Sequence, residues 1–151
     1  MNYMTKSLVR VRYAETDAMG IVHHSRYYPW FEIARDEYVK SLGFKYSQME
    51  KEGLYLPLIE SGAKYKEGAR YDDELSVTCR LTKMTYVRCT FTYEIIRNSD
   101  NKVLALGQTS HAFCDEKLKP INLKKKFPYY YEKLISLIFD EKWYYKFFLT
   151  F

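Results

Sequence analysis

The feature that most constrains the fold of this chain is an aromatic stretch between residues 25 and 43. Apolar residues recur there every three or four positions, as on one face of an α-helix: Tyr27, Trp30, Phe31, Ala34, Tyr38 and Leu42. The charged residues are expected on the other faces: Glu32, Arg35, Asp36 and Lys40. Pro29 fits only a first helical turn, so the helix should begin between Ser25 and Tyr28, and Gly43 should end it. A stripe this aromatic needs a sheet to cover it.

Much of the remaining chain shows the pattern of half-buried strands, in which apolar and polar residues alternate. Residues 7–13, 75–82 and 87–95 show the alternation clearly. Residues 54–66 read as extended but irregular, and residues 103–114 carry apolar or small side chains on both faces. One long helix with a run of antiparallel strands predicts an α+β fold.

The ends of the chain carry patterns of their own. In the first strand, Val9, Val11 and Tyr13 share the face that should point toward the helix. Residues 46–52 and 127–139 have helical patterns, the second as a terminal helix. Beyond it lies an aromatic tail with lysines, which we expect to pack on protein rather than on a membrane, because a short segment without paired anchors binds lipid weakly.

The length of 151 residues predicts one domain over residues 1–151, with residues 121–151 as a C-terminal helical and aromatic extension. No stretch approaches the roughly 18 consecutive apolar residues of a membrane span, and the first residues lack the apolar core of an export signal. A cytoplasmic location is therefore expected.

The positive charge of the chain is concentrated near its end. Residues 117–146 contain eight Lys against three acidic residues, a surplus that equals the whole net charge of +5. Such a run of lysines can bind phosphate groups, but it is equally often a charged surface that faces only solvent. Nucleic-acid binding is not expected, because no recognition motif for nucleic acid accompanies the charge.

The cysteines and histidines lack the spacing of metal ligands. No CxxC pair occurs, and the three cysteines lie in alternating segments, so we interpret them as reduced, half-buried thiols: Cys79, Cys89 and Cys114. The histidines likewise form no zinc pattern: His23, His24 and His111. No metal site is expected.

A loop with a carboxylate leads into the aromatic helix. Asp17 and Gly20 precede the helix N-terminus, whose free N–H groups and positive dipole end suit an oxygen that gains negative charge. On geometry alone, a Thr-Asp pair before a helix is more often a turn or a cap.

The same stretch resembles a family signature, T-D-x-x-G-x-V-x-H-x-x-Y-x-x-x-F-E-x-A-R. The matching residues are Thr16, Asp17, Gly20, Val22, His24, Tyr27, Phe31, Glu32, Ala34 and Arg35. The signature is that of the hotdog-fold acyl-CoA thioesterases of the 4-hydroxybenzoyl-CoA thioesterase family, especially the Tol-Pal-associated branch. The resemblance reaches about Pro120 and implies an antiparallel sheet of about five strands wrapped around one long central helix.

The resemblance also implies a reaction and the residues that perform it. Asp17 would act as general base or as nucleophile in thioester hydrolysis, and the backbone N–H of His24 would polarise the carbonyl. The His24 side chain would hold water or the carbonyl, or else only a hydrogen bond at the helix entry. Tyr13 matches a tyrosine that lines the site in the Tol-Pal-associated branch, and His23 receives no role.

Coenzyme A would enter as part of the substrate, with no separate cofactor. Arg88 and Lys83 correspond to the strand entry that meets the nucleotide in related enzymes, with residues 124–126 as a further basic group. The family implies a homodimer or homotetramer, with acyl-CoA or an acyl carrier protein as partner. Ala14 and Glu15 depart from the motif of the branch. The competing interpretation is a non-catalytic acyl-CoA or acyl-carrier-protein binder.

Overall fold

The computed structural model describes residues 2–139 of the chain. The aromatic tail of residues 140–151 lies outside the described residues, so its expected packing stays a prediction.

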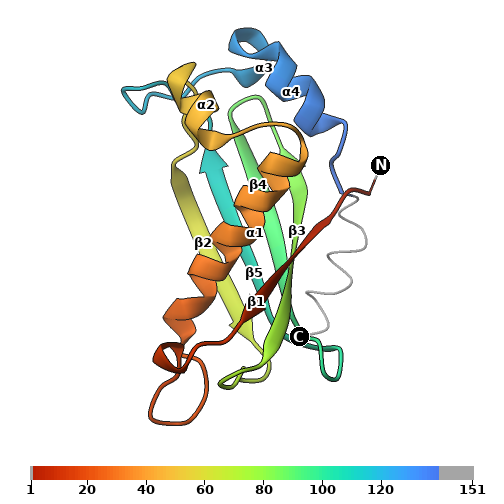
Figure 1. The fold of residues 1–151 in the computed structure, drawn as a ribbon. Coiled ribbons are helices and arrows are strands. Elements are labelled where there is room, and N and C mark those ends of the chain that lie inside the picture. Colours follow the sequence, from red (N-terminus) through yellow and green to blue (C-terminus); the bar gives the residue numbers. More distant parts are fainter. Residues whose placement is uncertain (1, 140–151) are drawn as a thin grey trace.

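One antiparallel sheet of five strands, in the order β1-β3-β4-β5-β2, forms the body of the protein. The strands are β1 (Thr5–Arg10), β2 (Leu58–Tyr65), β3 (Glu74–Met84), β4 (Arg88–Arg97) and β5 (Lys102–Ala112). Helix α1 (Tyr27–Ser41) runs across one face of this sheet, as Figure 1 shows. The α+β arrangement expected from the sequence is confirmed.

The helix buries the aromatic stripe that the sequence predicts. All six stripe residues have at most 8% of their surface exposed: Tyr27, Trp30, Phe31, Ala34, Tyr38 and Leu42. Pro29 lies in the first turn, and Gly43 follows the helix with φ of 86°. The Phe31 ring stacks on the Tyr93 ring of β4, with 4.7 Å between centroids. The stripe thus forms one core with the sheet.

Arg35 departs from the expected charged face of the helix. Its guanidinium points into the molecule, where Nη1 donates to the Tyr93 hydroxyl at 3.2 Å and to Thr109 Oγ1 at 3.5 Å. The position borders the aromatic stripe, one turn from Phe31 and from Tyr38, so a long side chain there can reach the sheet.

The first strand ends earlier than its alternation predicts. Ser7 and Val11 are buried and Val9 is half-buried on the expected face, but β1 stops at Arg10. A 3₁₀ turn, η1 (Tyr13–Glu15), follows and leaves Tyr13 78% exposed. The predicted inward position of Tyr13 is wrong, because the chain leaves the sheet before that residue.

The irregular segment after the helix becomes an edge strand. Helix α2 (Tyr46–Lys51) precedes β2, which pairs with β5 alone and has a bulge between Leu58 and Glu60. Most of β2 is exposed, including the apolar residues Leu58 and Ile59.

The predicted terminal helix over residues 127–139 is present but shorter, as α4 (Pro128–Ile135). A separate short helix, α3 (Leu123–Lys126), precedes it, and Phe127 leaves helical geometry between the two. Tyr130 and Leu134 are buried, as the predicted face requires. None of the described helices is long and apolar enough to span a membrane.

The three cysteines are buried and form no disulfide. Burial raises the pKa of the Cys89 thiol to about 12 and also raises the pKa of the Cys79 and Cys114 thiols. The expected half-burial of these thiols is wrong, because all three side chains are buried.

Candidate active site

The loop before α1 is a tight turn that fixes the Asp17 carboxylate. The Asp17 N–H donates to the Ile21 carbonyl at 2.8 Å, and the Gly20 N–H donates to the Asp17 carbonyl at 3.0 Å. Gly20 has φ of 79°, which favours glycine. Asp17 Oδ1 accepts a hydrogen bond from the Met19 N–H at 2.8 Å. This leaves Oδ2 free of protein hydrogen bonds within residues 2–139.

A buried carboxylate, Glu15, ties this loop to the helix. Glu15 is 4% exposed. Its Oε1 accepts from the Arg12 N–H at 2.8 Å, and its Oε2 accepts from Trp30 Nε1 at 3.1 Å. Its carbonyl accepts from the His23 N–H at 2.9 Å. Glu15, which departs from the family motif, therefore holds both sides of the Asp17 loop.

The entry to α1 offers a free donor. A 3₁₀ turn, η2 (His24–Arg26), leads into the helix, and His23 Nδ1 caps it by accepting from the Ser25 N–H at 3.3 Å. In the part of the chain that the structure describes, the His24 N–H has no protein acceptor. Such unsatisfied N–H groups at a helix start attract partial negative charge.

Asp17 and His24 line one cavity of about 330 Å³. The cavity lies between the loop, the start of α1 and the chain after β2. Its remaining walls are Met19, Ile21, Val22, Tyr27, Tyr65, Lys66, Glu67 and Gly68. The Tyr65 hydroxyl donates to the His24 carbonyl at 3.3 Å, which joins β2 to the helix entry. The structure thus brings together the predicted carboxylate and the predicted carbonyl-binding donor.

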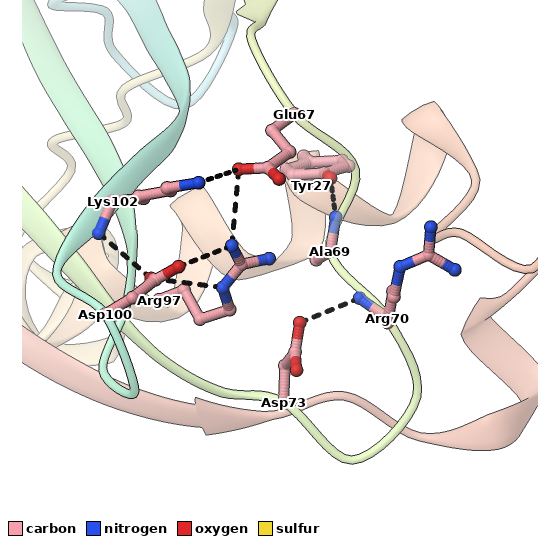
Figure 2. A network of polar contacts seen from close by, with 8 residues as sticks. All are labelled: Tyr27, Glu67, Ala69, Arg70, Asp73, Arg97, Asp100 and Lys102. Carbon is pink, nitrogen blue, oxygen red and sulfur yellow. Dashed lines mark hydrogen bonds and ion pairs between the residues drawn. The ribbon is translucent and has the colours of Figure 1, made fainter.

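A polar network holds the wall opposite the loop (Figure 2). The Ala69 N–H donates to the buried Tyr27 hydroxyl at 3.3 Å. Arg97 Nη2 lies 3.3 Å from Glu67 Oε2 and 2.7 Å from Asp100 Oδ2. The hydrogen bond to Asp100 raises the pKa of Arg97, and this effect outweighs the lowering that desolvation causes. The β4–β5 hairpin therefore anchors the wall that Glu67 contributes.

The other predicted site residues lie outside this cavity within one protomer. Tyr13 packs edge-on against Tyr71, with ring centroids 5.8 Å apart. Strand β3 begins at Glu74, near the cavity, and its eleven residues span roughly 33 Å. Lys83 lies near the other end of this strand. Arg88 begins β4 beside it and is exposed.

Several residues of the cavity had no sequence signal of their own. Tyr65 and Lys66 lie at the end of an irregular strand, and only its pairing with β5 places them beside His24. Gly68 makes room for the loop, because a Cβ there would come within 2.6 Å of Ile21 Cγ2. Within residues 2–139, no cluster of three or more metal-ligating side chains is found.

Comparison with known proteins gives this geometry a family. The model of the thioesterase-like superfamily matches residues 11–129, which include the loop, the helix and four of the five strands, β2 to β5. The chain belongs to this superfamily. The family resemblance predicted from the residues between Thr16 and Arg35 is confirmed.

Individual relatives agree with the assignment. YneP of Bacillus subtilis, a candidate acyl-CoA thioesterase, is 35% identical over 128 residues, which cover 83% of this chain and 91% of that protein. The acyl-CoA thioester hydrolase YbgC of Escherichia coli is 31% identical over 118 residues, which cover 78% of this chain and 87% of YbgC.

Among solved structures, the DHNA-CoA thioesterase of Staphylococcus aureus superposes with a TM-score of 0.83 and is 32% identical. The superposition covers 89% of this chain and 90% of the other. The predicted hotdog fold is confirmed by this match and by the superfamily assignment.

Proposed function

We propose that the protein is an acyl-CoA thioesterase, which hydrolyses an acyl-CoA thioester to a free acid and coenzyme A. The observation that carries the proposal is the shared cavity of about 330 Å³, which is lined by both Asp17 and His24; the His24 N–H has no acceptor among residues 2–139. A thioester carbonyl oxygen that accepts from the His24 N–H would gain stabilisation as its negative charge grows.

Asp17 would supply the attack on the carbonyl carbon. As general base it takes a proton from water, whose oxygen forms the new C–O bond. As nucleophile it forms a mixed anhydride that water then cleaves. In both routes the C–S bond breaks and the electron pair leaves with the sulfur, which requires little acid assistance because a thiol has a pKa near ~8.5.

A homodimer would complete the binding of coenzyme A. The candidate phosphate ligands Arg88 and Lys83 lie far from Asp17 in one protomer, so a second protomer would have to supply them. The outer edge of β2 has no strand beside it in the described chain and exposes Leu58 and Ile59. Strand pairing across this edge would join two copies of the sheet. A homotetramer would be two such dimers.

The direct test is thiol release from a panel of short, long and aromatic acyl-CoA thioesters, with one acyl carrier protein thioester added. We expect release from at least one member, well above the rate without protein. Binding of acyl-CoA without release over the whole panel would favour the non-catalytic binder instead. The acyl group that gives the highest kcat/KM would define the substrate class.

A further inference from the structure

The outer face of the sheet, opposite α1, is buried over β3 and β4. The residues that alternate there with the core positions point away from the helix and have at most 6% of their surface exposed: Thr78, Arg80, Thr92 and Glu94. On the same face, Leu8 of β1 is 68% exposed. Some part of the protein therefore covers the outer face of β3 and β4 and leaves that of β1 open.

Leu106 of β5 shows how far this covering extends. The strand register pairs Thr78 with Glu94 and Glu94 with Leu106, so the three side chains form one row across the outer face. Leu106 is fully buried, yet it does not belong to the hydrophobic core between α1 and the sheet. An apolar side chain that is buried on the outer face needs an apolar partner on that face.

An ion pair lies in the same buried area. Arg80 Nη1 donates to Glu94 Oε1, and both side chains are 8% exposed. On an open sheet face, such a pair would stand in water, because charged side chains are rarely buried without a surrounding structure that excludes solvent. The burial of this pair indicates that water is excluded from the outer face around it.

The described helices do not provide this covering. Helix α1 packs on the opposite face, and Figure 1 shows α2, α3 and α4 gathered at one end of the sheet. At the N-terminus, Tyr3 packs edge-on against Tyr38 and so lies on the helix side. The burial arises within one protomer. Strand pairing at the β2 edge would extend the sheet sideways and leave its outer face as it is.

Phe139, the last described residue, brings the chain onto the outer face. Strand β1 pairs with β3 only as far as Thr5, which lies opposite Cys79. Just beyond that point, the Phe139 N–H donates to the Leu81 carbonyl at 2.8 Å. The Phe139 ring lies over the Arg80 guanidinium, with 4.9 Å between the ring centroid and Cζ. This cation–π contact starts the covering of the ion pair.

We propose that residues 140–151 dock on the outer face of β3, β4 and β5, over the row from Thr78 to Leu106. Twelve residues reach roughly 40 Å when extended. The row lies only about 10 Å along β3 from Leu81 and spans about 10 Å across the sheet. The segment supplies many apolar and aromatic side chains: Trp143, Tyr144, Tyr145, Phe147, Phe148, Leu149 and Phe151.

The docked segment would limit how copies of the chain can join. A dimer through the β2 edge uses the side of the sheet and is compatible with docking. A homotetramer would have to join its dimers through surfaces other than the covered face. The docking segment lies beyond residue 129, where the superfamily match ends. Docking does not require thioester hydrolysis, so the two proposals are tested separately.

Trp143 is an intrinsic probe of docking in the full chain. The chain has two tryptophans, and Trp30 is buried in the core. The difference between the wild type and Trp143→Phe therefore isolates the fluorescence of Trp143. We expect Trp143 to emit at a shorter wavelength than it does in a synthetic peptide of residues 140–151. Acrylamide should quench it less in the protein than in the peptide.

Thr92→Asp places a charge beneath the docked segment, where Arg80 is already paired with Glu94. The substitution should shift docking by at least about 10²-fold toward the undocked state. Acrylamide quenching of Trp143 should then approach that of the peptide. The sheet should stay folded, because the new carboxylate faces water once the segment has left. Leu8→Asp, on the open part of the same face, is the matched control and should not change the quenching.

Charges in the docking segment keep the test decisive if Thr92→Asp fails to fold. Hydroxyl-radical footprinting of the full chain measures the exposure of Leu106, with Leu8 as the exposed reference. In the wild type, Leu106 should be labelled much more slowly than Leu8. The double variant Phe147→Asp/Phe148→Asp should raise the labelling of Leu106 toward that of Leu8, because the new charges oppose burial of the segment.

Three results would overturn the proposal. The first is a wild type in which Leu106 is labelled as fast as Leu8, or in which Trp143 is quenched as in the peptide. The second is protection of Leu106 that disappears on dilution, which would identify a second copy of the chain as the covering partner. The third is protection of Leu106 that the tail substitutions leave unchanged, which would assign the covering to another part of the chain.

Discussion

Phe31 of α1 packs directly onto Gly107 of β5, so closely that a Cβ at position 107 would overlap the Phe31 ring. This contact brings the helix against the sheet and fixes the depth of the core. Because the ring is fully buried and also stacks on Tyr93, it has no space into which it could move.

Gly107→Ala should therefore destabilise the protein by about 1–3 kcal/mol through overpacking. The double variant Gly107→Ala/Phe31→Leu should be less destabilised than the sum of its two single variants, because the smaller side chain makes room for the new methyl group. Urea unfolding of all four proteins measures this coupling. Strict additivity would show that the close approach of the helix does not constrain the fold.

Glu15→Ala should cost about 1–3 kcal/mol of unfolding free energy, because the buried Trp30 indole N–H and the part-buried Arg12 N–H lose their acceptor. Glu37→Gln on the exposed side of α1 is the matched control and should change stability little. The loss should also reduce turnover, because Glu15 holds the Asp17 loop. An unfolding free energy of Glu15→Ala equal to that of the wild type would contradict the structural role of Glu15.

The stability of the protein should fall as pH decreases from 7 to 5. Burial lowers the pKa of His111 from 6.5 to about 4, so the unfolded chain takes up a proton at a pH where the folded protein does not. Unfolding is therefore favoured progressively below pH 6.5, by about 2 kcal/mol at pH 5 from this residue. The difference between wild type and His111→Gln in urea unfolding at the two pH values isolates this contribution. Parallel pH dependence of the two proteins would contradict the buried neutral histidine.

Ile59→Glu should break the proposed dimer, because it places a charge on the exposed edge of β2. The wild type should sediment with the mass of a dimer or tetramer, and the variant with that of a monomer. If the second protomer supplies part of the site, the monomeric variant should also release thiol more slowly than the wild type. A monomeric wild type with full activity would refute the shared site.

The sequence predicts the helix better than the site, for physical reasons. The stripe from Tyr27 to Leu42 repeats a local period, so its burial is readable from spacing. The role of Arg35 is not readable in this way, because a charge at the border of the stripe looks solvated until Tyr93 and Thr109 are brought opposite it by the sheet.

The loop shows the same limit. Asp17 and His24 were predicted from a motif, and the structure places both in one cavity. Tyr13 belongs to the same motif region, but the early end of β1 turns it to solvent. Glu15 had no assigned role, because a carboxylate is expected at the surface unless its buried donors are known.

The account as a whole depends on the carboxylate of Asp17 facing the donor of His24, and the kcat of Asp17→Asn for the best acyl-CoA thioester tests it most directly. The substitution keeps the size of the side chain and the acceptor for the Met19 N–H, so circular dichroism and unfolding should match the wild type. We predict that thiol release falls by at least about 10²- to 10⁴-fold, while Glu37→Gln retains it. Turnover of Asp17→Asn within a few-fold of the wild type would contradict the mechanism.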